Sequence, residues 1–208
     1  MKRSGRPCAS ILVPDPVRGL RRIFAFGLLA LLGACATQPP VGPTTVAPEV
    51  DRFELRGRVA VKLDGRGHSA RMRWRHDVDT DAIWLYSPVG STIATLQADR
   101  DVAVLVTSKK ETYQSSDVQS LTRDVLGWDL PLAGLKYWVL GRVNPDSPIE
   151  QIEWDEQQRI KRLVQDGWDI EFAGYAENGA LPASLVLRFA DLRMRLLIDR
   201  WDIASIEQ

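Results

Sequence analysis

Apolar and polar side chains alternate along much of the chain, a pattern typical of β-strands with one face exposed to water. The alternation begins at Phe53, from which apolar residues occupy most odd positions up to Leu63 and charged residues stand between them. The segment 64–67, Asp-Gly-Arg-Gly, predicts a hairpin turn, and residues 70–75 then alternate again. Further strands are predicted at residues 82–87, 92–98, 102–107 and 111–115. The first half of the chain therefore predicts an antiparallel meander.

The period of the pattern changes in the middle of the chain. Residues 116–119, Ser-Asp-Val-Gln, resemble a capping box that opens a helix, and Gly127 marks its end. A second short helix is predicted to start at Pro131 and to end by Gly141. Strand patterns return at residues 149–154, 159–165, 168–174, 184–190 and 192–200.

These elements amount to about eleven strands and two short helices in a single domain, residues 51–208. About eight strands already enclose an interior that side chains just fill, so a larger sheet leaves room inside. Two short helices cannot cover both faces of such a sheet, which should therefore curl over them. We predict a mainly β (α+β) fold, an incomplete, curled antiparallel β-barrel with a short helical lid and a hydrophobic cavity.

The predicted cavity should be lined by aromatic and aliphatic side chains. The candidates are Trp74, Trp84, Leu135, Trp138 and Trp168. Tryptophan is also a common core residue, so packing in the core is the alternative for each of them.

The first 34 residues have the composition of a processing signal. Three arginines precede the apolar run 23–32, which is too short to span a bilayer. The run leads into residues 32–35, Leu-Gly-Ala-Cys, which are similar to the bacterial lipobox, whose cysteine is lipidated before cleavage. Without residues 1–34, Cys35 is the only cysteine, so no intramolecular disulfide can form. An ordinary secretory signal that ends near a chance cysteine is the alternative.

Residues 35–50 are predicted to hold the lipidated cysteine and a tether. Four prolines lie within residues 36–48, where they disfavour helix and sheet and favour an extended chain. Stable anchoring needs at least two acyl chains, and a triacylated cysteine exceeds that. In the lipoproteins that this segment resembles, aspartate after the cysteine retains the protein at the inner membrane. Ala36 therefore points to a lipid anchor on the periplasmic side of the outer membrane.

The charge balance changes when the signal is set apart. The chain has 27 basic and 27 acidic residues, but six basic and one acidic residue lie in 1–34, which leaves 21 basic against 26 acidic. This remainder lacks the dense basic stripe that nucleic acids require, so no nucleic-acid partner is expected. Arg71, Arg73 and Arg75 nevertheless share one strand face, which suits an acidic partner or lipid headgroups as well as plain solvent.

Sequence motifs for catalysis or metal binding are missing. The two histidines, His68 and His76, have no zinc-ligand spacing, and the chain has neither a phosphate-binding glycine loop nor G-x-S-x-G. Residues 77–81 imitate the start of an EF-hand loop but lack its glycine and its glutamate. We therefore expect no enzymatic activity, no catalytic residue, no metal and no cofactor.

Several segments, taken in order, resemble the LolB family of outer-membrane lipoprotein receptors. They are the lipobox, the tether, Arg56–Val59, Ser87–Thr92, Gly127–Leu132, Leu135–Gly141, Gly167–Trp168 and Leu196–Trp201. The resemblance implies an incomplete barrel lidded by helices, in agreement with the predicted pattern. Family members take lipoproteins from the periplasmic carrier LolA and insert them into the inner leaflet of the outer membrane. The implied partners of a monomeric chain are therefore LolA, the acyl chains of client lipoproteins and the outer membrane.

The segment 87–90, Ser-Pro-Val-Gly, predicts a type I turn between two strands. The family has an exposed leucine at the position of Val89, on a protruding loop that engages the membrane. The resemblance thus implies that Pro88, Val89 and Gly90 form a membrane-insertion loop, with a plain turn as the alternative. For the whole chain, the alternative is a lipid-anchored structural or assembly module whose interior is filled by its own side chains.

Overall fold

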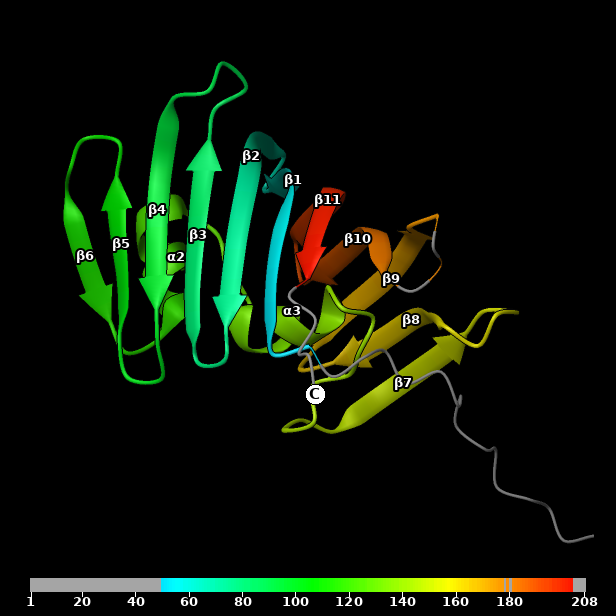
Figure 1. Ribbon diagram of the computed structural model, residues 1–208. Coiled ribbons are helices and arrows are strands. Elements are labelled where there is room, and N and C mark those ends of the chain that lie inside the picture. The colour runs from blue at the N-terminus through cyan, green and yellow to red at the C-terminus, as the bar shows by residue number, and fades with distance from the viewer. Residues whose placement is uncertain (1–49, 178, 180, 204–208) are drawn as a thin grey trace, which may run out of the picture. The chain divides into compact units, whose positions relative to one another are not determined.

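The computed structural model describes residues 50–177, 179 and 181–203. Within these residues the chain forms eleven strands in one antiparallel sheet and two helices (Figure 1). The predicted signal, the lipobox with Cys35 and residues 35–49 of the tether lie outside the described residues. Val50 is already buried in the core.

The strands and helices follow one another nearly as the sequence predicts. The first strands are β1 (Arg52–Leu63), β2 (Arg66–Asp77), β3 (Thr80–Tyr86), β4 (Thr92–Ala98), β5 (Ala103–Thr107) and β6 (Thr112–Ser115). The helices are α2 (Val118–Leu126) and α3 (Leu132–Trp138). The remaining strands are β7 (Ile149–Trp154), β8 (Ile160–Gln165), β9 (Trp168–Tyr175), β10 (Pro182–Phe189) and β11 (Leu192–Ile203).

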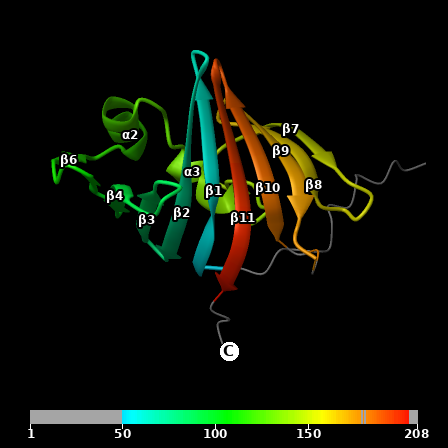
Figure 2. The ribbon, with the colours of Figure 1, turned by 90° about the horizontal axis from the view of Figure 1, so that it is seen from above.

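The first and last strands along the chain, β1 and β11, pair with each other at the centre of the sheet. The order is β6-β5-β4-β3-β2-β1-β11-β10-β9-β8-β7, so β6 and β7 are edges and the sheet does not close. Seen from above, it curves around α3, and both helices lie on its inner face (Figure 2). The predicted incomplete, curled antiparallel barrel with a helical lid is confirmed.

The hairpin of β1 and β2 at the centre of the sheet is formed by an alternating strand and a two-residue turn. Phe53, Leu55 and Val59 face inward and are buried, while the charged residues between them, Glu54, Arg56 and Arg58, face the outer side. Asp64 and Gly65 have φ of 49° and 76°, as a tight hairpin with right-twisted strands requires. The turn is shorter than predicted, because residues 66 and 67 already pair with β1.

A β-bulge explains why β11 is longer than predicted. The register between β1 and β11 shifts at Arg56 and Gly57, opposite Asp199. The bulge interrupts the alternation near residue 200, so the continuation to Ile203 is not visible in the sequence pattern. Glycine is required in β1 at this point, since a Cβ on Gly57 would collide with the carbonyl oxygen of Leu197.

Helix α2 begins one residue later than a capping box at Ser116 would place it. Asp117 is the N-cap, and its carboxylate accepts hydrogen bonds from the backbone N–H groups of Gln119 and Ser120 at 3.2 and 2.9 Å. The prediction of Ser116 as the cap was wrong, because an aspartate in the next position satisfies the free N–H groups directly. Gly127 ends the helix in the left-handed conformation, as predicted.

A polar residue organises the core below α3. Gln165 is fully buried, and its side-chain oxygen accepts hydrogen bonds from Trp138 Nε1 at 3.0 Å and from the backbone N–H of Asn144 at 2.9 Å. Its amide nitrogen donates to the carbonyl groups of Asn144 and Ser147, both at 2.8 Å. Trp138 packs on Trp168, with ring centres 6.5 Å apart. All side-chain hydrogen-bonding groups of Gln165 are therefore in use.

Candidate functional site

An apolar pocket lies between α2 and the inner face of the sheet. Its volume is about 170 Å³. Its lining residues come from the β1–β2 hairpin, the facing ends of β3 and β4, and the end of α2: Val59, Val61, His68, Ser69, Ala70, Leu85, Ile93, Leu126 and Trp128. Leu85 and Ile93 lie next to the loop that joins β3 to β4. The pocket therefore lies at the end of the strands from which this loop extends.

A second, smaller pocket lies deeper below α2. Its volume is about 20 Å³, and it shares Leu85, Leu126 and Trp128 with the first pocket. An apolar cavity of about 150 Å³ holds a molecule of the size of benzene. In this conformation the two pockets therefore have room for only a segment of an acyl chain.

Helix α2 and the segment that follows it form one connected lid. The Thr122 hydroxyl donates to the carbonyl of Gln119 at 3.1 Å and accepts from the backbone N–H of Leu130 at 3.0 Å. Arg123 forms an ion pair with Asp129 at 2.6 Å. These contacts hold the segment 127–130, which contains Trp128, against α2. We call residues 118–130 the α2 lid.

Four of the predicted cavity residues are packed in the core. Trp74, Leu135, Trp138 and Trp168 are at most 1% exposed, and neither apolar pocket is lined by any of them. Trp74 donates a hydrogen bond from Nε1 to Asp81 at 2.7 Å. Satisfied indole groups and complete burial are typical of structural tryptophans.

The structure contradicts the placement of Trp84 in the interior. Trp84 lies opposite Arg73 and Thr95 on the outer face, and the Arg73 guanidinium is 5.0 Å from its ring centre. Its neighbours Ile83 and Leu85 face inward instead. The prediction failed because tryptophan was expected inside, whereas the period of the strand places residue 84 outside.

Leu126 and Trp128 line the pocket but are not among the residues predicted from the sequence. The two residues lie on either side of Gly127, the C-cap of α2. A tryptophan directly after a helix-ending glycine, between two amphipathic helices, was the available signal. Only the tertiary structure shows that it lines the pocket.

The loop between β3 and β4 is a tight turn with an exposed apolar tip. Gly90 donates its backbone N–H to the Ser87 carbonyl at 2.8 Å, which confirms the predicted turn with Pro88 at its second position. Val89 is 88% exposed, more than any other large hydrophobic residue in the described part of the chain. The loop extends beyond the ends of the neighbouring strands (Figure 1).

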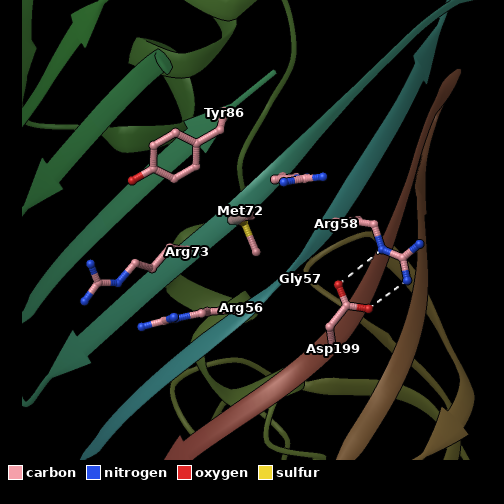
Figure 3. Close-up of a pocket in the computed structure, with 8 residues that line it drawn as sticks. Arg56, Gly57, Arg58, Met72, Arg73, Tyr86 and Asp199 are labelled. Atoms are coloured by element: carbon pink, nitrogen blue, oxygen red, sulfur yellow. Dashed lines mark hydrogen bonds and ion pairs between the residues drawn. The ribbon is translucent and has the colours of Figure 1, made fainter. Parts of the chain in front are cut away.

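The outer face of β1 and β2 carries a network of arginines around two carboxylates. Glu54 accepts hydrogen bonds from Arg73 at 2.9 and 2.7 Å and from Arg56 at 3.1 and 3.0 Å. The hydrogen bonds from Arg73 contribute most to lowering the pKa of Glu54 to about 2. Asp199 accepts two hydrogen bonds from Arg58, at 3.2 and 2.7 Å (Figure 3).

Residues 77–81, which resemble part of an EF-hand, form the ends of β2 and β3 and the turn between them. No cluster of His, Cys, Asp and Glu suited to a metal ion occurs in the part of the chain that the structure describes. Within the same residues, no helix has the length and apolar character needed to cross a membrane.

Comparison with known proteins places the chain in a family. The family model described as outer membrane lipoprotein LolB matches residues 51–201. The outer-membrane lipoprotein LolB of Nitrosomonas europaea is 35% identical over 195 residues, which cover 86% of this chain and 92% of the relative. That of Thiobacillus denitrificans is 35% identical over 187 residues, covering 89% and 100%. A LolA superfamily structure from Nitrosomonas europaea has a TM-score of 0.44 and 8% identity, covering 76% of this chain and 88% of that chain. On the family model and the identity to these relatives, the chain belongs to the LolB family of outer-membrane lipoproteins.

Proposed function

We propose that this protein is an outer-membrane-anchored receptor that accepts lipoproteins from the periplasmic carrier LolA and inserts them into the inner leaflet of the outer membrane. One observation carries the proposal. The apolar pocket below the α2 lid lies at the same end of the strands as the exposed Val89. An acyl chain that leaves the pocket at this end of the strands is next to Val89, the side chain that would enter the bilayer.

The transfer requires no covalent chemistry. Each methylene group of an acyl chain gains about 0.8 kcal/mol when it leaves water for an apolar environment. Direction then follows from graded affinity, with the pocket binding more tightly than the carrier and less tightly than the bilayer. Because the pocket holds only a segment of a chain, loading requires the α2 lid to move away from β3 and β4.

We assign the anchor to the amino-terminal segment. In this proposal residues 1–34 are removed, Cys35 carries the acyl chains, and residues 36–49 tether the domain, which already includes the buried Val50. The composition of the segment supports it, with an apolar run that ends in Leu-Gly-Ala-Cys and a proline-rich stretch after it.

A two-stage assay tests both the pocket and the loop. The mature chain with Cys35→Ala first takes a labelled lipoprotein from LolA and then delivers it to liposomes. Val89→Glu places a charge where contact with hydrocarbon is required, so we expect delivery to fall by about tenfold or more while uptake survives. Val89→Leu should match or exceed the parent, since it adds apolar area.

Val78 provides the control for this assay. It is 49% exposed in the turn between β2 and β3, at the other end of these strands. Val78→Glu should change neither stage. Equal loss of both stages in Val89→Glu would mean that the loop supports the pocket rather than the membrane contact. Absence of uptake in the parent would reject the receptor function itself.

A further inference from the structure

A groove on the outer face of β11, β1, β2 and β3 has no role in the transfer described above. It is open to solvent, and its volume is about 650 Å³. It is lined by Arg56, Gly57, Arg58, Arg71, Met72, Arg73, Tyr86 and Asp199 (Figure 3). We call it the arginine groove. It lies on the side of the sheet opposite the α2 lid, so it is separate from the apolar pocket.

The arginine groove has more positive than negative charge. Four arginines line it, against Asp199 as the one lining carboxylate and Glu54 beside it. Asp199 is engaged by Arg58, while Glu54 is shared by Arg56, Arg73 and, at 3.6 Å, Arg75. Each guanidinium has five N–H donors, and two carboxylates cannot occupy all of them. The network therefore holds the arginines in place and leaves donors free.

Two lining groups have no side-chain partner in the described part of the chain. Arg71 is exposed and makes no ion pair or side-chain hydrogen bond with residues 50–177, 179 or 181–203, and neither does the Tyr86 hydroxyl. The guanidinium of Arg71 and the hydroxyl donor of Tyr86 in one groove suit an anion with several acceptor oxygens. A guanidinium fits two oxygens of a phosphate side by side.

The groove lies close to the loop that we propose to enter the bilayer. Tyr86 is three residues before Val89, so the two are at most about 10 Å apart along an extended chain. The headgroup zone of each leaflet is roughly 5 to 8 Å thick. With Val89 in the hydrocarbon, the Tyr86 end of the arginine groove is therefore within reach of the lipid phosphates.

We infer that the arginine groove binds the phosphate of a phospholipid headgroup, with Arg71, Arg73 and Tyr86 as donors, and thereby orients the sheet on the membrane during delivery. This inference rests on the proposed membrane contact of Val89. It assigns to the outer face a role that the apolar pocket and the loop do not perform, because neither of them selects a phosphate.

The test uses the lipidated protein in proteoliposomes that contain a phospholipid with a photoreactive headgroup. Adducts are mapped by mass spectrometry, and we expect them on residues 69–73 and 84–87. Arg71→Gln leaves both carboxylate networks intact and should lower the adduct yield about fivefold, the effect of one basic residue at an anionic surface. Glu54→Gln removes a competing carboxylate and should raise the yield by a similar factor.

Arg195→Gln is the matched control. Arg195 is an exposed arginine that pairs with Ala60 of β1 in the same sheet but does not line the groove, so its loss should leave the yield unchanged. An equal loss of adduct yield in Arg195→Gln and Arg71→Gln would mean that lipid is attracted by the overall positive charge rather than bound in the groove, and would overturn the inference. Abolition of the adducts by excess inorganic phosphate would identify a site for free phosphate instead, and protection by LolA would identify an acidic protein surface.

The outcomes separate this inference from the proposed function. If the parent delivers lipoproteins and Val89→Glu does not, but no adducts form in the groove, only the phosphate site is rejected. If Val89→Glu delivers normally, the membrane contact of the loop is rejected, and with it the basis for placing phosphates at the groove.

Discussion

The two helices lie on the same face of one sheet, but the regions that they cover are packed differently. Below α3, two buried tryptophans and a fully hydrogen-bonded Gln165 fill the space, and neither apolar pocket extends to these side chains. Below the α2 lid the inner face carries smaller side chains such as Ala70 and Ala94, and both pockets are found there. Large, satisfied side chains thus make one region rigid, while smaller apolar ones leave the other able to open.

This difference explains how one domain can be stable and still admit a ligand. Interiors are normally close-packed, so space for a ligand must come from a region where packing contributes less to stability. We therefore expect the α3 region to contribute most of the stability and the α2 region to open without loss of the fold. The following predictions test this division, from the largest expected effect to the smallest.

The same tryptophan deletion should have different effects in the two regions. Trp138→Ala should destabilise the protein by about 3 to 5 kcal/mol, because the ring is completely buried and its indole N–H is hydrogen-bonded. Trp128→Ala should cost only about 1 to 2 kcal/mol, because part of its ring already borders empty space. Urea unfolding of both variants measures the difference, and equal losses would contradict the division into two regions.

Removal of the buried amide should destabilise the α3 region by about 2 to 3 kcal/mol. Gln165→Leu leaves the indole N–H of Trp138 and the backbone groups of Asn144 and Ser147 without their partner. The exposed Gln97 on β4 is the control, and Gln97→Leu should change stability by less than about 0.5 kcal/mol. Hydrogen exchange should show the loss of protection in β8 and β9 rather than in β3 and β4.

Filling the pocket should weaken acyl binding without loss of the fold. Ala70 lines the pocket and is only partly buried, so Ala70→Phe places a ring in the space that the acyl segment would occupy. We expect a fatty-acyl fluorescent probe to bind about tenfold more weakly, equivalent to about 1.4 kcal/mol. Ala60→Phe adds the same ring on the exposed outer face of β1 and should leave binding unchanged. Equal binding by Ala70→Phe and the parent would place the acyl site elsewhere.

The smallest effect concerns pH and involves neither region. The pKa of Glu54 is lowered from 4.5 to about 2 in the folded protein, so its contribution to stability is complete above about pH 4.5 and is lost as the pH falls towards 2. After solvent screening we expect about 1 kcal/mol. Glu54→Gln should lose this amount at pH 7 and show a smaller decrease between pH 5 and 2. Glu171→Gln, which removes an exposed ion pair with Arg188, serves as the control.

Most of the fold could be predicted from the sequence because strand alternation and turn residues act locally. Every strand and both helices were predicted within a few residues, since each one is set by its own period, its Gly or Pro residues and its exposed face. The errors lie where a local rule has two solutions. Ser116 and Asp117 are both suitable N-caps for α2. The bulge at Asp199 interrupts the alternation, so the end of β11 could not be located from the sequence.

The turn at Val89, the arginine-rich outer face and the lipobox-like segment could likewise be identified in the sequence, because each depends on neighbouring residues. Which apolar residues line a pocket and which fill the core could not, because both roles use the same side chains. Trp74, Trp138 and Trp168 are packed in the core, and Trp128 borders the pocket. That assignment depends on which helix covers which strands, and the pairing of β1 with β11 and the positions of α2 and α3 are set only by contacts between residues far apart in the chain.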